Sequence, residues 1–506
     1  MIKKFILFSF LFLSGLYLSA QEKGFLSIME DAQGRSMKPS DIVETSDGGF
    51  LISTFENEGM SSKIIKIDNE GISVNEIDFV MQDTTVKLTN IFPMNDEDCY
   101  KVVGVCIPEN NDYAAIITIW IDNNLTIMDS CIETISFSDQ ALYSIRFLNQ
   151  GNSVVSALIF KTLGQQGETY LSRLSEEGRI VRYQECNSDS ILFMDNLFNI
   201  RSNPNHFGLY ARTSSSSLAM SGVHVFDSSL RIVRSRYFNR WHTEGSTVFS
   251  ATMNAIECMM APLPDGCYAI STKLDSQEIY PNGNLIWEDR SVILLKADPD
   301  FNLLQDSIII EYKNDSIEIP AVFRSVDYNN DGYLYQCSNG NVVYPNMSYR
   351  PGLHLIVTKT DVDLNIVWQK RYLKGETAFL GFTSLATSDG GYIVTGTHYA
   401  MTGNYCYDVF VLKINPDGSV GTDDISVENV RPYAFSPNPA HDHISFRYSD
   451  DVNPAQIEVY DLQGRLLHKQ SNDFEQLQLQ SLTVGQYLIK ITMKDGRLYT
   501  DKVVKE

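Results

Sequence analysis

The chain has 506 residues, of which 43% are hydrophobic, and it carries a formal net charge of −23 at neutral pH. Its length exceeds one ordinary core and its hydrophobic content is that of a folded chain, so we expect more than one globular domain rather than disorder. The negative charge would repel phosphate backbones, and no Lys/Arg cluster interrupts it. This argues against nucleic acid as a partner.

The first residues have the pattern of a secretory signal peptide. Lys3 and Lys4 precede the apolar run Phe5 to Leu18, and Ser19 and Ala20 complete a cleavage site of small residues. The alternative is a transmembrane anchor, but the run is shorter than the roughly 20 residues that a bilayer needs. No Cys lies at the cleavage point, so an N-terminal lipid anchor is not indicated. We expect residues 1–20 to be removed and the mature chain to be exported and water-soluble.

The eight Cys residues all lie between Cys99 and Cys406, and their spacing shows no metal-ligand pattern. Disulfides are chemically permitted in an exported protein. Cys99 and Cys106 would lie roughly 23 Å apart along one extended strand, which is beyond disulfide reach. We expect most of the Cys residues to be small buried hydrophobes rather than a disulfide framework.

One sequence unit recurs along the chain. The segment Thr45–Thr54 returns as Thr387–Gly396, and each copy has an Asp-Gly-Gly turn followed by a β-branched and aromatic run. Similar turns open seven units, at Asp47-Gly48-Gly49, Asn95 to Asp98, Asn149 to Asn152, Asn203-Pro204-Asn205, Pro264-Asp265-Gly266, Asn330-Asp331-Gly332 and Asp389-Gly390-Gly391. Each unit can be written as four strands, with a second tight turn, often led by Asp or Asn, between the third and the fourth.

The seventh unit lacks a fourth strand, and a strand without a unit, Gly24 to Met29, precedes the first. If this strand completes the last sheet, the ends of the chain close a ring and remove a free edge. The predicted fold is all-β: a seven-bladed β-propeller over residues 21–422. Its repeat resembles the secreted bacterial propeller repeats with the Asp-Gly-Gly-Tyr and Leu-Lys-Ile signature.

Catalytic and metal motifs are weak or missing. Thr45 to Gly49 matches the first half of a sialidase Asp-box, but Leu51-Ile52 departs from the second half. The segment Asp327 to Gly332 begins like a calcium loop, yet its twelfth position is Ser338, and a plain turn explains the same residues. We expect no cofactor, no metal and no catalytic residue. A carboxylate pair assembled from distant loops stays open as an alternative.

Aromatic residues gather on the long loops expected on one propeller face. Exposed rings on neighbouring loops suit stacking on sugars or anchoring of a peptide. The alternative is that they fold back and cover the blade ends. The candidate ligand-binding residues are Trp241, Tyr280, Trp287, Tyr344, Tyr349, Tyr399 and Tyr405.

The composition changes after a linker at residues 423–433. Alternating apolar and polar residues with Gln-Gly and Asp-Gly turns predict a small immunoglobulin-like β-sandwich over residues 434–506. Its motifs resemble the type A C-terminal sorting domain of the type IX secretion system. They comprise Pro437, Asn438, Pro439, Tyr460, Asp461, Gly464, Arg465, Gly485, Tyr487 and Lys490. The alternative is an immunoglobulin-like binding module fused to the propeller.

The resemblance implies export by the type IX machinery, removal of the domain by its sortase, and either release or attachment to lipopolysaccharide at the outer face of the outer membrane. It says nothing about the task of the exported protein. We expect a secreted, surface-displayed, non-catalytic recognition or scaffold protein with an unidentified glycan or protein ligand. The alternative is a propeller-fold glycan hydrolase or lyase whose acidic residues meet in the central channel.

Overall fold

The computed structural model describes residues 24–506, apart from residues 58, 95–97, 110–112, 137–140, 152, 162–167, 187–190, 216–217, 239, 245–246, 280–284, 311–316, 330, 343–351, 376, 400–406, 422–424, 430–432, 438, 449–452 and 495–497. Within this part of the chain the regular secondary structure is β-strand, so the fold is all-β as predicted. Its described residues include no helix long and apolar enough to cross a membrane.

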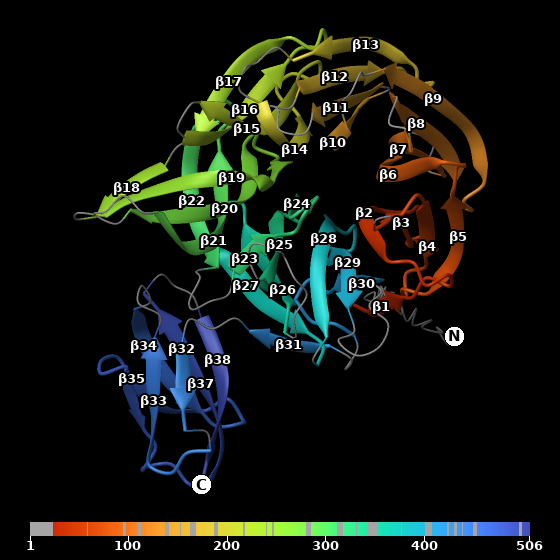
Figure 1. Ribbon diagram of the computed structural model, residues 1–506. Coiled ribbons are helices and arrows are strands. Elements are labelled where there is room, and N and C mark those ends of the chain that lie inside the picture. The colour runs from red at the N-terminus through yellow and green to blue at the C-terminus, as the bar shows by residue number, and fades with distance from the viewer. Residues whose placement is uncertain are drawn as a thin grey trace, which may run out of the picture.

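The strands up to Asn429 form seven sheets that follow one another around a ring (Figure 1). The first three sheets are regular and have four antiparallel strands each. They comprise β2 (Met37–Glu44), β3 (Phe50–Glu56), β4 (Ser62–Ile67) and β5 (Ser73–Phe79); β6 (Thr84–Pro93), β7 (Cys99–Pro108), β8 (Tyr113–Asp122) and β9 (Ile127–Ser136); and β10 (Ala141–Gln150), β11 (Ser153–Lys161), β12 (Glu168–Leu174) and β13 (Ile180–Glu185).

The next three sheets are the fourth, which also has four strands, and the fifth and sixth, which have extra strands. They comprise β14 (Ile191–Asn199), β15 (Phe207–Ser215), β16 (Leu218–Phe226) and β17 (Ile232–Phe238); β18 (Arg240–Glu244), β19 (Thr247–Pro262), β20 (Tyr268–Ile279), β21 (Leu285–Ala297) and β22 (Leu303–Ile310); and β23 (Ile317–Pro320), β24 (Val326–Tyr328), β25 (Tyr333–Val342), β26 (His354–Asp361), β27 (Ile366–Leu373) and β31 (Ser426–Asn429).

The seventh sheet joins the two ends of the ring. It consists of β28 (Ala378–Ala386), β29 (Tyr392–Tyr399), β30 (Asp408–Ile414) and the N-terminal strand β1 (Leu26–Met29). Strand β1 pairs antiparallel with β30, from Leu26 opposite Leu412 to Met29 opposite Val409. The prediction that the N-terminal strand completes the last sheet is therefore confirmed.

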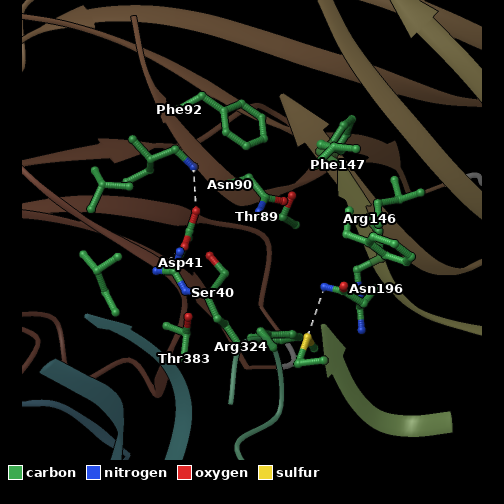
Figure 2. A pocket seen from close by; sticks show the side chains of 18 of the residues that line it. Ser40, Asp41, Thr89, Asn90, Phe92, Arg146, Phe147, Asn196, Arg324 and Thr383 are labelled. Carbon is green, nitrogen blue, oxygen red and sulfur yellow. Dashed lines mark hydrogen bonds and ion pairs between the residues drawn. The ribbon is translucent and has the colours of Figure 1, made fainter. Parts of the chain in front are cut away.

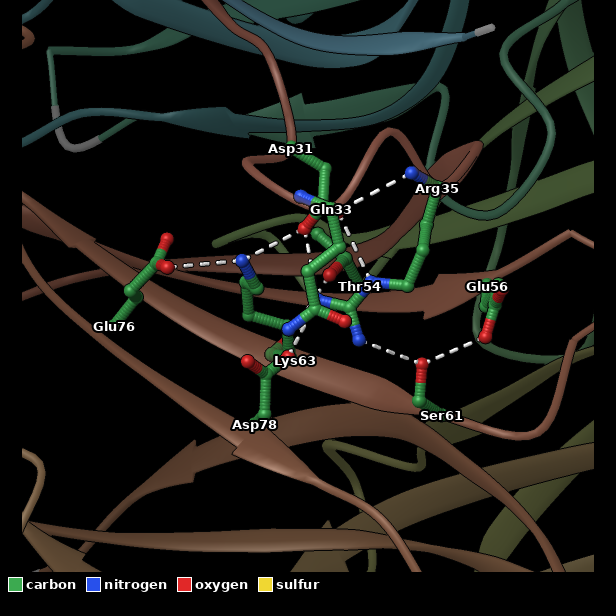
Figure 3. Close-up of polar contacts among 9 residues, drawn as sticks. All are labelled: Asp31, Gln33, Arg35, Thr54, Glu56, Ser61, Lys63, Glu76 and Asp78. Carbon is green, nitrogen blue, oxygen red and sulfur yellow. Dashed lines mark hydrogen bonds and ion pairs between the residues drawn. The ribbon is translucent and has the colours of Figure 1, made fainter.

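A buried ionic network follows the closing strand (Figure 3). The Asp31 carboxylate accepts from Arg35 at 2.8 Å and from Lys63 at 2.9 Å, and Arg35 also pairs with Asp78 at 2.7 Å. These hydrogen bonds, chiefly the one from Arg35, hold the pKa of Asp31 well below its usual range against the opposing effect of burial. Because Lys63 and Asp78 lie on β4 and β5, the network ties the segment after β1 to the first sheet.

Lysines of the third strands explain the repeated sequence signature. Lys66 Nζ lies 2.6 Å from Asp47, the turn residue of its own sheet, and donates to the backbone oxygen of Asn123 in the next sheet at 2.9 Å. In the seventh sheet, Lys413 Nζ lies 2.6 Å from Asp389. The Asp of the Asp-Gly-Gly turn and the Lys of the third strand thus form one ion pair within each of these sheets, and glycines with positive φ, Gly48 and Gly390, make the turns possible.

The second turn of most sheets is led by Asp, as predicted. Asp122 Oδ1 accepts hydrogen bonds from the backbone N–H groups of Asn124 and Thr126, and Asp298 does the same with Asp300 and Asn302. The side chain therefore replaces a backbone acceptor in the turn.

Apolar side chains fill the spaces between adjacent sheets. One cluster, for example, joins Leu51 and Ile64 of the first sheet to Val86 and Val102 of the second. Six of the Cys residues are free thiols in the part of the chain whose side chains are described, and Cys106, Cys267 and Cys337 are buried. The expectation of small buried hydrophobes is confirmed for these three.

Two further sheets follow the ring. They are built from β32 (Tyr433–Ser436), β33 (His443–Tyr448) and β36 (Gln476–Gln478), and from β34 (Pro454–Tyr460), β35 (Leu466–Gln470), β37 (Gly485–Met493) and β38 (Leu498–Lys505). Both sheets contribute to one core, in which Ile444 and Phe446 of the first meet Ile457 and Ile489 of the second.

The predicted linker contains a strand. Strand β31 pairs antiparallel with β27, with Glu428 opposite Arg371 and Val427 opposite Tyr372. An outer strand has unpaired backbone groups that an extended segment can satisfy, and the opposite charges favour this register. The linker expectation is therefore wrong for Ser426–Asn429, which belongs to the sixth sheet.

Candidate functional site

The innermost strands of all seven sheets line one cavity of about 730 Å³ (Figure 2). Strands β2, β6, β10, β14, β19, β24 and β28 each contribute residues to its wall. This volume lies within the range of ligand pockets, roughly 300 to 1,000 Å³. The cavity is the candidate functional site.

A β-bulge interrupts the pairing of several inner strands at equivalent places. The register shifts just before Asp41 in β2, Asn90 in β6, Asn196 in β14 and Thr383 in β28. A bulge leaves one residue unpaired and re-aims the side chains beside it. In this protein it brings polar side chains to the cavity wall inside otherwise apolar strands.

Two of these side chains, and Asp327 of β24, connect neighbouring sheets. Asp41 Oδ2 accepts a hydrogen bond from Ile91 N at 3.0 Å, and Asn196 Oδ1 accepts one from Met260 N at 3.4 Å. Asp327 Oδ2 accepts from Ala386 N at 2.9 Å. Each oxygen satisfies a backbone N–H of the next sheet, which would otherwise be buried without a partner.

The inner edge of the sixth sheet is interrupted. Strands β23 and β24 both pair with β25. Ala321 and Ser325 still bond to Cys337 of β25, and residues 322–324 leave the sheet between them. Pro320 is the last residue of β23, a position that tolerates proline although proline has no N–H to donate to the next strand. The excursion carries Phe323 and Arg324 to the cavity wall.

Phe323 reaches across to the third sheet. Its N–H donates to Phe382 O at 2.6 Å, which fixes it beside the seventh sheet. The guanidinium carbon of Arg146, from β10, lies 5.6 Å from the centre of the Phe323 ring. A cation over an aromatic face is a favourable contact.

Arg324 links three sheets. Its Nη2 donates to Ile42 O at 2.7 Å and lies 3.3 Å from Asp41 Oδ1, while its Nε donates to Ser384 O. The hydroxyl of Ser384 in turn donates to Arg324 O at 2.8 Å. The sixth, seventh and first sheets are therefore joined at one side chain.

Two carboxyl groups of the cavity, those of Asp41 and Asp327, have shifted pKa values, but their oxygens already accept hydrogen bonds. Burial raises the pKa of Asp41 and of Asp327, and the nearby charge of Arg324 opposes the rise in both. Raised carboxyl pKa values can mark a general acid. Yet Asp41 accepts from Ile42 N and Ile91 N, and Asp327 accepts from Tyr328 N and Ala386 N. Both oxygens of each carboxyl already bind backbone donors, which is the arrangement of a structural link.

The calcium-loop resemblance has a structural explanation in the same segment. Besides the engaged Asp327, Asn329 Oδ1 accepts from Asp331 N at 3.2 Å and from Tyr333 N at 3.0 Å. These oxygens organise the turn, which supports the plain-turn alternative.

The structure describes three of the predicted aromatic residues, and all three lie in strands. Tyr399 is half-buried at the end of β29, with its ring 5.6 Å from that of Tyr407. Trp241 and the neighbouring His242 lie in β18, and Trp287 lies in β21 opposite Gln277, so the expectation that they lie in loops is wrong. An additional hairpin extends the fifth sheet there. Tyr280, Tyr344, Tyr349 and Tyr405 lie outside the described residues.

The predicted sorting motif contains a turn of the kind seen in the ring. Asp461 Oδ1 accepts from Gln463 N and Arg465 N, and Gly464 has a positive φ of 81°. The Tyr487 hydroxyl donates to Thr483 O at 2.6 Å.

The other motif residues occupy simpler positions. Tyr460 ends β34, Gly485 begins β37, and Lys490 lies 4.0 Å from Glu458. Pro437 and Pro439 are exposed, and Asn438 lies outside the described residues.

Sequence reasoning missed the cavity residues Asp41, Asn90, Arg146, Asn196 and Arg324. Each lies in or beside a strand-like run, where a polar residue reads as a solvent-facing position. One signal was available: Pro320 breaks the strand pattern before the sixth turn, which marks an interrupted inner strand. The bulges have no comparable sequence mark.

Comparisons with solved structures give distant similarities. The chain is similar to the β-propeller domain of the Trilobed protease from Pyrococcus furiosus, with 10% identity, a TM-score of 0.39, and coverage of 76% of this chain and 97% of that one. It is similar to 1,3Gal43A, an exo-β-1,3-galactanase from Clostridium thermocellum, with 14% identity, a TM-score of 0.33, and coverage of 70% and 78%. Both TM-scores are below 0.5, so neither likeness carries an argument about what this chain binds or does. No curated protein matches the sequence.

The C-terminal part has a family match. Residues 434–506 match the model of the secretion system C-terminal sorting domain. This is the segment whose motifs resemble the type IX sorting domain. The match supports export of the chain through the type IX secretion system, and it implies contact with that machinery.

Proposed function

We propose that the protein is a secreted recognition or scaffold protein without catalytic activity, displayed at the cell surface or released. In this proposal the seven sheets are the blades of a seven-bladed β-propeller of the Asp-Gly-Gly-Tyr type, over residues 21–422. The last two sheets form an immunoglobulin-like sandwich that serves as the sorting domain, over residues 434–506. The signal peptide of residues 1–20, the sortase and the lipopolysaccharide anchor belong to the same proposal.

The hydrogen bonds accepted by the carboxyl groups of the cavity are the main support for this proposal over the enzyme alternative. A glycan hydrolase or lyase needs acidic groups that are free to exchange protons with a substrate or with water. Asp41 and Asp327 instead accept two backbone hydrogen bonds each, and Glu44 accepts from Ser388 N and Oγ. These bonds support a structural role for the acidic residues that meet in the cavity.

The ligand-binding surface of this proposal is the set of aromatic residues at the ends of the fifth, sixth and seventh sheets. Trp287 on β21 and Tyr399 on β29 belong to it. Rings at the ends of strands are held more rigidly than rings in loops, which lowers the entropy lost when a sugar or peptide stacks on them.

A binding screen tests the recognition function. The purified mature chain is incubated with glycans and matrix proteins. The variant Trp287→Ala/Tyr349→Ala is compared with a variant that carries two alanines at exposed ring positions of the second and third sheets, Tyr113 and Tyr183. We expect the first variant to lose binding, because each stacked ring contributes roughly 1 kcal/mol. Equal loss in both variants, or unchanged binding in the first, would contradict the aromatic site.

A deletion tests the export route. Without residues 434–506 the protein should accumulate in the periplasm, as measured by fractionation and by protease accessibility of intact cells. Normal surface levels of the shortened chain would show that the segment is not its address.

A further inference from the structure

In the described part of the cavity wall, the carboxylates already have hydrogen-bond partners, whereas two cations and one hydroxyl have unused donors. Its carboxylates Asp41, Asp327 and Glu44 all accept hydrogen bonds from protein donors. Two of its cations keep donors without a protein partner among the described residues: the ammonium of Lys87 and the Nη1 of Arg324, whose side chain is 30% exposed. Thr383, which is 1% exposed, has a hydroxyl with no partner in the same part of the chain.

These three free donors lie on one side of the cavity. Arg324 Nε donates to the backbone oxygen of Ser384, which follows Thr383 in β28. Arg324 also pairs with Asp41, and the hydroxyl of the preceding Ser40 donates to the backbone oxygen of Leu88, next to Lys87. Thr383, Arg324 and Lys87 thus lie on the seventh, sixth and second sheets, and hydrogen bonds of their chain neighbours connect these sheets through the first.

We infer that the cavity binds a small molecule through a carboxylate. Three donors on one wall, two of them cationic, match the acceptor oxygens of such a group, and charge-assisted hydrogen bonds to Arg and Lys are the stronger kind. An unpaired buried hydroxyl is costly unless a ligand or water completes it. The site stands apart from the aromatic residues of the proposed function, so the failure of either leaves the other unaffected.

The remaining wall fits the rest of such a ligand. Phe92 and Ile145 are half-buried and present apolar surface, while the Thr89 hydroxyl, which donates to Val103 O at 3.4 Å, can still accept a hydrogen bond. The volume of about 730 Å³ accommodates a ligand the size of one or two sugar rings. An acidic sugar and an aromatic acid share this chemistry, and the experiment separates them.

Calorimetric titration of the chain without its signal peptide, residues 21–506, tests the inference with three probes: glucuronate, glucose as its uncharged counterpart, and benzoate as a carboxylate without sugar hydroxyls. We expect glucuronate, benzoate or both to bind, with glucose at least about tenfold weaker than the better acid, since one hydrogen bond to a charged group contributes about that factor. Tighter binding of glucuronate identifies a sugar acid, and tighter binding of benzoate identifies an apolar acid. Failure of both acids, or equal binding of glucose, would overturn the inference.

Two variants that spare the fold locate the site. Lys87→Met removes a charge that has no partner among the described residues, and it should weaken binding of the better acid roughly tenfold. The matched change Lys494→Met, on an exposed lysine of the C-terminal sheets, should not. Thr383→Val should also weaken binding while leaving the melting temperature equal or higher, because it removes an unpaired buried hydroxyl. Binding unchanged in Lys87→Met, or weakened as much in Lys494→Met, would place the acid elsewhere and contradict the site.

Discussion

The Asp-Gly-Gly turns with their paired lysines, which we call the rim of the ring, differ from the strands around the cavity in how far their residues repeat from sheet to sheet. At the rim, the first and seventh sheets repeat the same residues: Asp47 with Lys66, and Asp389 with Lys413. Around the cavity, equivalent positions after the bulges hold Asp41, Asn90, Asn196 and Thr383. Repetition marks a contact that stabilises the turn within a single sheet. The positions that vary from sheet to sheet are those where one side chain can link several sheets, as Arg324 does for the sixth, seventh and first.

Loss of the closing strand should have the largest effect on the ring. A chain that begins at Ser36 lacks β1 and the Asp31 network, so β30 loses its partner and Lys63 loses a buried anion. Several ladder hydrogen bonds and a buried charge pair disappear together, and we expect destabilisation of 5 kcal/mol or more, on the order of the stability of a whole domain. Thermal unfolding measures it. A chain that begins at Lys23 is the control, and equal melting temperatures for the two would contradict the closure.

Substitution of Arg324 should have the next largest effect and shows how the cavity differs from the rim. Arg324→Met leaves Asp41 without its cation and removes links among three sheets, at a cost of roughly 3 kcal/mol in the free energy of unfolding. The double variant Arg324→Met/Asp41→Asn should recover part of this loss, because the buried charge is gone. Chemical denaturation measures both, and additive losses would show that the two side chains are not coupled.

The rim pairs should differ in strength according to burial. Asp389→Asn breaks a pair in which Lys413 is 1% exposed and should cost about 2 kcal/mol. Asp47→Asn breaks a pair whose carboxylate is 48% exposed, so solvent screening reduces the loss to less than about 1 kcal/mol. Denaturation of the two variants side by side tests the difference, and a larger loss for Asp47→Asn would contradict it.

The two regions should also respond to pH with opposite signs. Burial acts to raise the pKa of Asp389, but the hydrogen bond from Lys413 lowers it below the ordinary 3.8. The stability that Asp389 contributes is therefore present above about pH 4 and is lost as the pH falls further. Burial leaves the pKa of Asp41 above 3.8, so ionisation of Asp41 reduces stability as the pH rises through that raised value.

Unfolding curves between pH 3 and pH 7 check these signs. The stability difference between the wild type and Asp389→Asn should shrink on acidification. The Asp41→Asn variant should gain on the wild type as the pH rises, whatever its constant offset. Parallel curves for all three proteins would show that neither carboxyl has a shifted pKa.

Reducing agent should have the smallest effect. The described Cys side chains are free thiols, and burial raises the pKa of Cys106 to about 11 and that of Cys337 further, which keeps both as unreactive thiols. We expect the same melting temperature with and without reductant. A fall of several degrees would reveal a disulfide that contributes to stability.

The sequence predicts the parts of this structure that depend on local chemistry. Asp-Gly turns and the Asp-led second turns follow from the backbone preferences of a few residues, and the position of β1 follows from counting strands. The cavity could not be predicted, because a bulge at Asn90 or the path of Arg324 depends on neighbours that are distant in sequence. The same holds for β31, because no local feature of Ser426–Asn429 indicates that it pairs with β27. It also holds for Trp241 and Trp287, which the β18–β19 and β20–β21 hairpins place in strands.

Turnover by the wild type and by Asp41→Asn, measured together against a panel of glycans, shows whether the acidic residues of the cavity transfer protons. We expect these residues to connect sheets and to transfer none. The wild type should then yield no new reducing ends and no unsaturated products, and Asp41→Asn should have a lower melting temperature. Product release by the wild type that disappears in Asp41→Asn, with the melting temperature unchanged, would contradict this expectation and establish the enzyme.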